Sequence, residues 1–512
     1  MMRRVLVLTL TCLLVSAAVF AGGQSEGQGA GGAEVEEGPK ELVFATSVPA
    51  PSLDPYNEIA DARMRRSPLV YDTLVEWTGD FGVAPGLAES WEYDGNTLRF
   101  ELRDGVVFHD GSSFDSADVV YSLEKVLESP GAGFYSQIES LSAPDDLTLE
   151  IEVATPSDAL LAALGGRYAY IVPEGAVEEY DLTQTAVGTG AFKVDEFAQG
   201  QYLRLSKNEE YWRADEIDLD LLTIQIVPDE ASIAAGLRSG EVDAAIFEDA
   251  RIADLVEGSS DLTVFQESAA RWDILDFPAL QTEPWSNMKF RQAIVAAINP
   301  EAVMSLAIND RGTLLGGHPP ALWGALPYDE APYAAQDLDL ARQLLEESGV
   351  DPGTPLTLLS IQGYGALNSG AEVIVDQLSQ IGLDVDIEIM ELGNWIDVFL
   401  NREFDTFTMN AWGGWIDPDQ LYYNHLHMQP GGRDFRKWNN EEVSDLLDEA
   451  RSSVDRQERE ELYLELQEIL AEEVPWMPLY SADFVGAYRE NVSNWGVHPS
   501  GYYHDLRWVT VE

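Results

Sequence analysis

Residues 411–419 have the clearest capacity in this sequence to contact a small molecule. They read Ala-Trp-Gly-Gly-Trp-Ile-Asp-Pro-Asp. The indole rings of Trp412 and Trp415 offer flat apolar faces, and Gly413–Gly414 leaves the backbone between them uncovered. A buried carboxylate at Asp417 would favour a cationic amine. The segment therefore predicts a site that grips an extended or flat ligand, with core packing as the alternative for each tryptophan.

Other chemistry-bearing patterns are sparse. Of the six histidines, only His425 and His427 are close together. On a strand this spacing would place both rings on one face for a soft divalent metal, but no third ligand is apparent, so we predict no metal and no cofactor. The sequence also lacks a G-x-S-x-G elbow, an H-E-x-x-H motif and a phosphate-binding P-loop. We expect a binding protein rather than an enzyme, with a secreted hydrolase that uses paired carboxylates as the weaker alternative.

Two kinds of segment must position these residues. Residues 97–102 and 147–153 alternate apolar and polar side chains, which predicts half-buried antiparallel strands. Residues 219–247 and 356–389 each predict a strand, a helix and a second strand, which is typical of a parallel sheet with a crossover. Two separated α/β units indicate two lobes.

Two amphipathic helices are expected near the end of the chain. Asn439 and Glu442 resemble a capping box, and the apolar residues after them recur at helical spacing. A second helix over about 462–470 should end at Pro475. Both helices are expected to pack on the surface of a lobe.

Length and charge narrow the class of protein. The chain has 512 residues, 45% of them hydrophobic, with 90 Asp and Glu against 30 Lys and Arg, a formal net charge of −60 and one cysteine. A chain of this length is enough for about three domains. So acidic a surface would repel phosphate backbones, so no nucleic acid partner is expected. Because concentrated salt screens self-repulsion, the acidity also predicts adaptation to salty surroundings.

The N-terminus indicates export. Arg3 and Arg4 precede an apolar run over 5–20, and Val19-Phe20-Ala21 fits a cleavage site, which predicts a signal peptide at 1–21 cut after Ala21. The run is shorter than a spanning helix needs, although a membrane anchor remains the alternative. Cys12 lies inside the run and is poorly flanked for a lipid anchor. Residues 22–40 predict a flexible Gly/Glu-rich tether, and the protein is expected to be periplasmic or cell-surface associated.

Ordered motifs run through most of the remaining chain. The strongest block is PGLAESWE at 85–92 followed by TLRFELRDGVVFHDG at 97–111. The other motifs, in order, are Leu53-Asp54-Pro55, Asp118 to Ser122, Gly188 to Phe192, Asn208 to Trp212, Phe290 to Ile294, Ala297 to Asn299, Leu344 to Gly349, Gln377 to Gly382, Phe404-Asp405, Arg459 to Tyr463 and Val474 to Tyr480. Together they resemble the family 5 extracellular solute-binding proteins, which are the dipeptide, oligopeptide and nickel receptors of ABC importers.

The resemblance implies an α/β, two-lobed periplasmic-binding-protein fold of the Venus-flytrap type, with a β-rich subdomain inserted in lobe one. Lobe one would comprise residues 41–76, 186–276 and 476–512, the inserted subdomain 77–185 and lobe two 277–475. The chain would cross between lobes near 272–278 and again near 473–478. The lobes would close on a solute, and the membrane-bound permease of the importer would recognise the closed form. A monomer is expected.

The resemblance also implies a ligand and a set of contacts. A di- or oligopeptide is favoured and an oligosaccharide is the alternative. In peptide-binding relatives an Asp shortly after the Trp of this turn holds the amino group of the ligand. Here Trp415 stands at that position, so either Asp417 takes over the ammonium or no ammonium is bound. The other implied cleft residues are Ser47 and Val48 on the first strand segment, Trp395 near the ligand, Arg402 as a partner for a peptide carboxylate, and Trp272 with Asp273 where the chain enters the second lobe.

Overall fold

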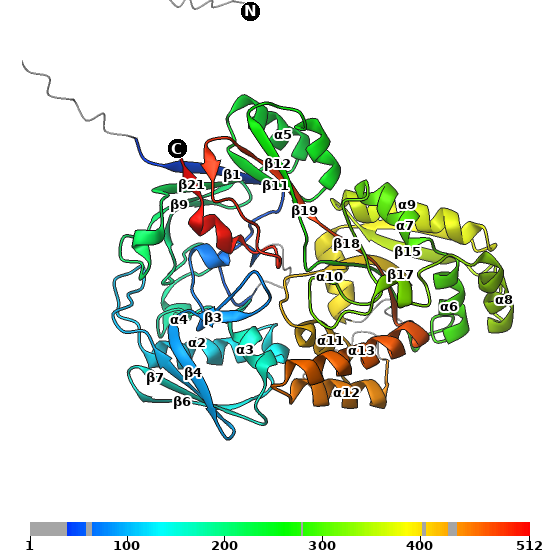
Figure 1. The fold of residues 1–512 in the computed structure, drawn as a ribbon, viewed down its shortest axis with the longest axis horizontal. Helices are drawn as coiled ribbons and strands as arrows, with labels where there is room; N and C mark the ends of the chain where they lie inside the picture. The colour runs from blue at the N-terminus through cyan, green and yellow to red at the C-terminus, as the bar shows by residue number, and fades with distance from the viewer. Residues whose placement is uncertain (1–37, 58–63, 278–279, 402–405, 429–437) are drawn as a thin grey trace, which may run out of the picture. The chain divides into compact units, whose positions relative to one another are not determined.

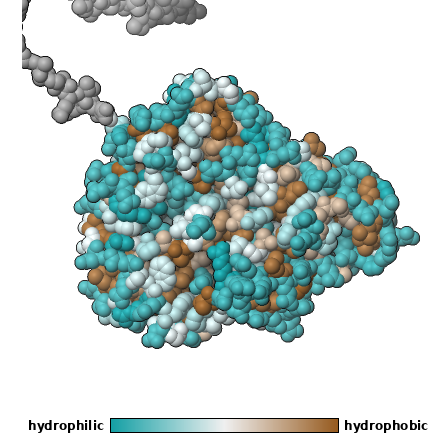
Figure 2. Space-filling view, in the orientation of Figure 1, coloured by the Kyte–Doolittle hydropathy of each residue, from teal (hydrophilic) through white to brown (hydrophobic). Residues whose placement is uncertain are grey.

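The computed structural model describes residues 38–57, 64–277, 280–401, 406–428 and 438–512 (Figure 1). The predicted signal peptide and most of the predicted tether lie outside these ranges. Pro39–Glu512 form one compact unit. The face of this unit in Figure 2 is largely hydrophilic with scattered apolar patches, in keeping with the acidic composition.

A seven-stranded mixed sheet is built around the first strand of the described chain. Strand β1 (Glu41–Thr46) runs parallel to a neighbour on each side, and its apolar residues Leu42 and Phe44 are fully buried. The sheet order is β12 (Leu262–Glu267), β19 (Phe484–Arg489), β11 (Ala244–Phe247), β1, β10 (Leu221–Ile226), β9 (Tyr202–Lys207) and β8 (Phe192–Ala198).

The strand, helix and strand predicted over 219–247 are present as β10, α5 (Glu230–Ser239) and β11. Asp229 caps the start of α5, and Gly240 ends it at a φ of 81°, in the left-handed region that glycine adopts without strain. The crossover skips one position, because β1 lies between β10 and β11. The periodicity could not reveal this, since the intervening strand comes from nearly 200 residues earlier in the chain.

A second, six-stranded mixed sheet contains the other predicted crossover. β15 and β16 are parallel neighbours joined by α9 (Gly365–Ser379), which confirms the strand, helix and strand expected over 356–389. The sheet order is β14 (Gly312–Leu314), β18 (Trp476–Ala482), β13 (Trp272–Asp276), β17 (Phe407–Trp412), β15 (Leu356–Ile361) and β16 (Val385–Met390).

The passages between these two sheets differ from the expected positions. The chain leaves β12 at Glu267 and already pairs within the second sheet from Trp272 onward, and it returns at Asp483, between β18 and β19. Residues 272–276 and 476–482 thus belong to the six-stranded sheet rather than to the first. Both strands are buried throughout, and a continuous buried run does not indicate which of two sheets will receive it.

A four-stranded antiparallel sheet occupies the region where alternating strands were predicted. Its order is β4 (Ala88–Asp94), β5 (Thr97–Leu102), β7 (Thr148–Val153) and β6 (Ile138–Asp145). Gly105 and Gly111, each directly after an Asp, take positive φ values of 75° and 87°, which glycine adopts without strain in a turn. Short strands β2 (Val75–Trp77) and β3 (Val83–Pro85) pair nearby, and β20 (Val492–Ser493) pairs with β21 (Thr510–Val511).

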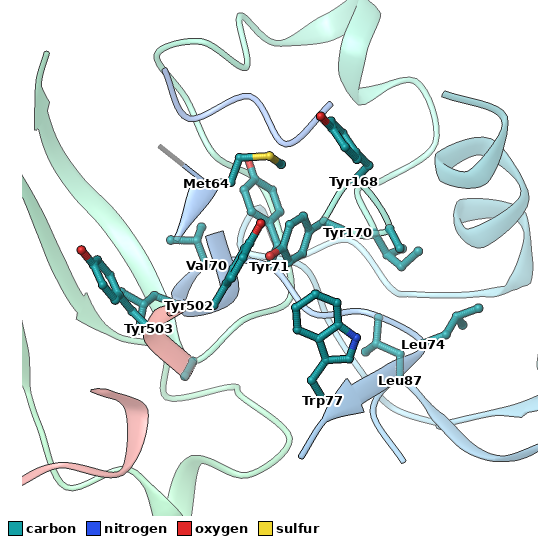
Figure 3. Close-up of a cluster of buried hydrophobic side chains, with 14 of the residues drawn as sticks. Met64, Val70, Tyr71, Leu74, Trp77, Leu87, Tyr168, Tyr170, Tyr502 and Tyr503 are labelled. Carbon is teal, nitrogen blue, oxygen red and sulfur yellow. The ribbon is translucent and has the colours of Figure 1, made fainter. Parts of the chain in front are cut away.

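The hydrophobic core beside the four-stranded and seven-stranded sheets joins segments that are far apart in sequence. Figure 3 shows Trp77, Tyr170 and Tyr502 among its buried side chains. The motif Gly188-Thr189-Gly190 packs against the same region, where a Cβ on Gly190 would lie 2.4 Å from the carbonyl carbon of Val70. This close approach explains why glycine is needed there.

The remaining helices cover the sheets. Those not yet named are α2 (Ser116–Glu128), α3 (Asp158–Leu164), α4 (Ala176–Glu179), α6 (Met288–Ala296), α7 (Pro300–Ile308), α8 (Leu338–Ser348), α10 (Leu392–Asn401), α11 (Pro418–Leu426), α12 (Glu441–Arg451) and α13 (Arg456–Glu473). The 3-10 turns are η1 (Ser67–Leu69), η2 (Ala132–Tyr135), η3 (Ala214–Glu216), η4 (Ala250–Leu255), η5 (Tyr328–Glu330) and η6 (Tyr503–Trp508). The two predicted late helices are α12 and α13, which pack on one another. The cap of α12 is Asn440, whose side chain accepts from Val443, and not Asn439 as predicted.

Candidate functional site

A cavity of about 180 Å³, open to solvent, lies where all three larger sheets send segments. Arg65, Glu248 and Phe484 reach it from the side of the seven-stranded sheet. Gly131, Phe134, Arg167 and Tyr168 contribute from the region of the four-stranded sheet. The end of β17 with α10 and α11 forms the opposite wall.

An aromatic wall forms one side of this cavity. On α10, the rings of Trp395 and Phe399 stack with centroids 5.0 Å apart. Phe399 lies 5.2 Å from Trp412 at the end of β17, and Trp412 meets the ring of His425 on α11 edge-on at 4.4 Å. Trp415 stacks on Trp412 at 6.4 Å. The wall gives a ligand a continuous apolar and aromatic surface.

The turn between β17 and α11 exposes its backbone to the cavity. Gly414 has a φ of 82°, which a residue with a side chain would adopt only with strain. A Cβ on Gly413 would make only an ordinary van der Waals contact, 3.5 Å from the carbonyl oxygen of Ala270. Both glycines line the cavity, so their peptide groups are accessible to an extended ligand.

A chain of charged groups closes the opposite side. Arg65 donates to Glu248 at 2.5 Å, Arg271 lies 3.7 Å from the same carboxylate, and Arg271 also pairs with Asp273 at 3.2 Å. Burial alone would raise the pKa of Glu248, but the charges of Arg65 and Arg271 outweigh it and lower that pKa. Burial raises the pKa of Asp273 despite the opposing charge of Arg271.

The structure brings five of the predicted contact residues together in this cavity. Trp412, Gly413, Gly414, Trp415 and Trp395 all line it.

Asp417, predicted as a possible partner of a ligand ammonium, is not among the residues that line the cavity. Its two carboxylate oxygens accept from Arg459 at 2.6 and 2.8 Å, and it also caps α11 by accepting from Asp419. The side chains of Asp417 and Arg459 are 6% and 3% exposed. Burial alone would lower the pKa of Arg459, but the charge of Asp417 raises it above its ordinary value. The carboxylate is thus already fully paired within the core.

Four other predicted contacts also lie outside the cavity wall. Ser47 donates to Glu230 at 2.5 Å, and Val48 is buried beside it. The Nε1 of Trp272 donates to the carbonyl of Gly317, and its ring packs on Trp476. Asp273 sits behind Arg271 and holds that guanidinium at the wall. Arg402 lies outside the described residues.

Several lining residues were not anticipated from the sequence. Among them are Arg65, Arg167, Glu248, Arg271, Phe399, Asn410 and Asn424. Two signals were available. Arg65-Arg66 is a basic doublet in a very acidic chain, and Arg271 directly precedes the predicted crossing.

The histidine pair does not form the strand arrangement considered above. His425 lies within α11 and faces the cavity, whereas His427 caps that helix and its Nε2 lies 3.2 Å from Asp448. Within the described ranges, no group of three His, Cys, Asp or Glu residues could hold a metal ion. Every helix in the described part of the chain is too short or too polar to cross a bilayer.

Comparison with known proteins agrees with this architecture. Residues 82–433 match the family model described as "Bacterial extracellular solute-binding proteins, family 5 Middle". The chain is 28% identical to Di/tripeptide-binding protein 2 of Pseudomonas aeruginosa, over 92% of this chain and 95% of that protein. It is 26% identical to the dipeptide-binding protein of Escherichia coli, over 85% and 88% of the two chains.

A solved structure gives the same result for the fold. The periplasmic binding protein DppA of Helicobacter pylori, in complex with the peptide STSA, superposes with a TM-score of 0.82. The two chains are 27% identical, with 93% of this chain and 99% of that one covered. The predicted two-lobed α/β fold is thereby confirmed. The chain belongs to the family 5 bacterial extracellular solute-binding proteins.

Proposed function

We propose that this protein is an extracytoplasmic receptor that captures a di- or oligopeptide in the cavity and delivers it to the permease of an ABC importer. The cavity itself carries the proposal. It offers aromatic faces to side chains and exposes the backbone of Gly413 and Gly414 to an extended main chain. Relatives named as di- and tripeptide-binding proteins, matched over most of their length, support a peptide as the solute.

Closure of the lobes around the peptide is part of this proposal, with the lobe boundaries as expected from the sequence except at the two passages. Polar contacts join elements on the two sides of the cavity. Arg451 on α12 donates to Ser136 after η2 at 3.1 Å, and Arg251 on η4 lies 3.4 Å from Ser369 on α9. Contacts of this kind are individually weak, which suits an interface that must open to release its ligand.

The compartment follows from the family and from the N-terminal sequence. We propose export with cleavage after Ala21, and action as a monomer that binds without chemical turnover. Family members are extracellular solute-binding proteins by description.

The test is identification of the bound solute. The mature protein would be purified, denatured and the released small molecules identified by mass spectrometry. The ligand-free protein would then be titrated calorimetrically with di- to hexapeptides and with maltooligosaccharides. Micromolar or tighter binding of a peptide is expected, whereas binding of sugars alone would replace the proposal with the oligosaccharide alternative.

A matched pair of variants locates the binding. Trp412→Ala removes part of the aromatic wall and should weaken peptide binding at least tenfold. Trp91→Ala changes a half-buried tryptophan on β4, outside the cavity wall, and should leave the affinity unchanged. Equal effects of the two substitutions would contradict a site in this cavity.

A further inference from the structure

Three buried N–H groups in the cavity wall have no hydrogen-bond partner in the described chain. They are Nε1 of Trp412, Nε1 of Trp415 and Nδ2 of Asn410. Trp415 and Asn410 are 3% and 2% exposed. Because a buried donor without a partner costs about 1–3 kcal/mol, groups of this kind in a native wall point to an acceptor supplied by a ligand.

Each of these three groups acts as a hydrogen-bond donor. An indole Nε1 can only donate. The Oδ1 of Asn410 already accepts from the backbone N–H of Ala411 at 2.8 Å, so its Nδ2 is the end left unpaired. Asn410 and Trp412 are two residues apart on β17, which places them on one face of the strand.

Asn424 on α11 adds a fourth group to the same wall. Neither its Nδ2 nor its Oδ1 has a partner in the described chain, so this amide can offer either a donor or an acceptor. The four residues therefore present at least three donors and at most one side-chain acceptor.

The charges of the wall point the same way. Among the described residues that line the cavity, Arg65, Arg167 and Arg271 are cationic and Glu248 is the single carboxylate. Glu248 already accepts from Arg65 and lies beside Arg271. An ammonium group entering this cavity would meet no uncommitted carboxylate in the described wall, since Asp417 is also paired with Arg459.

We propose that the cavity selects its ligand by a carboxylate, which accepts from the N–H groups of Trp412, Trp415 and Asn410, and that a free α-ammonium group is not recognised. A carboxylate has two oxygens and about four acceptor positions, enough to satisfy all three donors. The inference rests on the proposed function in taking a peptide as the solute. It adds that the peptide is held by its acidic end.

The first experiment compares three calorimetric titrations of the ligand-free protein. The probes are Ala-Phe, N-acetyl-Ala-Phe, which lacks the ammonium, and Ala-Phe amide, which lacks the carboxylate. Acetylation should change the affinity by less than about threefold, and amidation should weaken it at least tenfold. A tenfold loss on acetylation, or a smaller loss on amidation, would overturn the inference while leaving peptide binding intact.

Failure of the proposed function gives a different pattern. If none of these peptides binds, indole-3-acetate and tryptamine supply a carboxylate and an amine on the same ring system. Binding of indole-3-acetate alone would keep carboxylate selection and reject the peptide. Binding of tryptamine alone, of both or of neither would overturn carboxylate selection as well.

Substitutions then test the named groups with N-acetyl-Ala-Phe or, failing peptides, indole-3-acetate. Trp415→Phe keeps an aromatic ring but removes its N–H, and should weaken binding about tenfold. Trp495→Phe is the matched control, because its Nε1 is also buried and unpaired but lies outside the cavity wall. It should leave binding unchanged. Equal affinity in the two variants would overturn the role of Trp415.

A charge substitution gives the opposite sign of effect for the two probe types. Asn424→Asp places an acid in the wall. It should weaken the binding of N-acetyl-Ala-Phe at least tenfold and strengthen the binding of Ala-Phe amide. If a folded variant kept the parent's ratio of affinities for N-acetyl-Ala-Phe and Ala-Phe amide, the proposal would be overturned. Circular dichroism reports whether the variant folds, and Trp415→Phe carries the test if it does not.

Discussion

Replacing Asp417 by Asn separates a structural role for this acid from a ligand-binding one. Asn keeps the size of the side chain and can still cap α11, but it removes the charge that faces Arg459. The geometry places Asp417 in a buried ion pair with two hydrogen bonds. The substitution should therefore damage the stability of the protein and spare its affinity.

The magnitude follows from the burial of both partners. The side chain of Arg459 is 3% exposed, so the substitution leaves a guanidinium without its counter-charge in the core. Breaking such a pair by removing one partner costs about 3–5 kcal/mol. Arg459 keeps its hydrogen bond to the carbonyl of Ala450 and its position over the ring of Trp323. We therefore expect a loss near the lower end, about 3 kcal/mol.

The assay is urea unfolding at pH 7 followed by far-ultraviolet circular dichroism, with calorimetric titration of the bound solute. Asp455→Asn is the control, because Asp455 caps α13 in the same way but is exposed and should cost less than about 0.5 kcal/mol. Adding Arg459→Met to Asp417→Asn should restore part of the loss, with a coupling of about 2 kcal/mol. The dissociation constant should stay within about threefold of the parent value.

One result would refute this reasoning. If Asp417→Asn were as stable as Asp455→Asn and bound free-amine peptides at least tenfold more weakly, Asp417 would be a ligand contact. The ion pair with Arg459 would then be incidental.

Three further predictions concern stability. The melting temperature should rise with NaCl, because a net charge of −60 repels itself less when screened; a flat or falling curve would reject this. Burial lowers the pKa of His318 to about 4, so the unfolded chain binds a proton between about pH 6.5 and 4 that the folded chain does not, and stability is lost as the pH falls through that window. His318→Asn should lose less stability than the parent between pH 6.5 and 4.5, by about 2 kcal/mol, in urea titrations; equal slopes would contradict this. Gly190→Ala should lower the melting temperature by several degrees, because its Cβ would overlap the backbone of Val70, whereas Gly79→Ala, which meets no neighbour, should not.

Local structure was predictable wherever periodicity and capping agreed. The helix at 230–239 begins after Asp229 and ends before Gly240, and both signals lie in the sequence beside it. The strand at 97–102 alternates because one face packs inward and the other faces water. The insertion of β1 between β10 and β11 was not predictable, because burial on both faces of a strand does not identify its neighbours.

In the candidate site, too, some residues were predictable from local sequence and others were not. The Trp-Gly-Gly-Trp turn was predictable because its composition is unusual by itself, and the cavity contains all four residues. The partner of Asp417 lies 42 residues later in the chain, so no local pattern could tell a carboxylate that faces a ligand from one that faces Arg459. Arg65 and Glu248 were missed for the same reason, since their ion pair joins positions 183 residues apart.

The charge of the whole chain and the charge of the cavity wall have opposite signs. Acids number 90 against 30 bases in the sequence, whereas three arginines and one glutamate stand among the described residues of the wall. In dilute buffer the acidic surface would repel the carboxylate that we propose the cavity selects. Salt near 1 M shortens the range of that repulsion to about 3 Å, but it screens buried groups such as Glu248 and Arg271 much less. Concentrated salt would therefore weaken the long-range barrier to an anionic solute while leaving short-range recognition in place, so an acidic exterior and a carboxylate-selective cavity are compatible in the salty surroundings that the composition predicts.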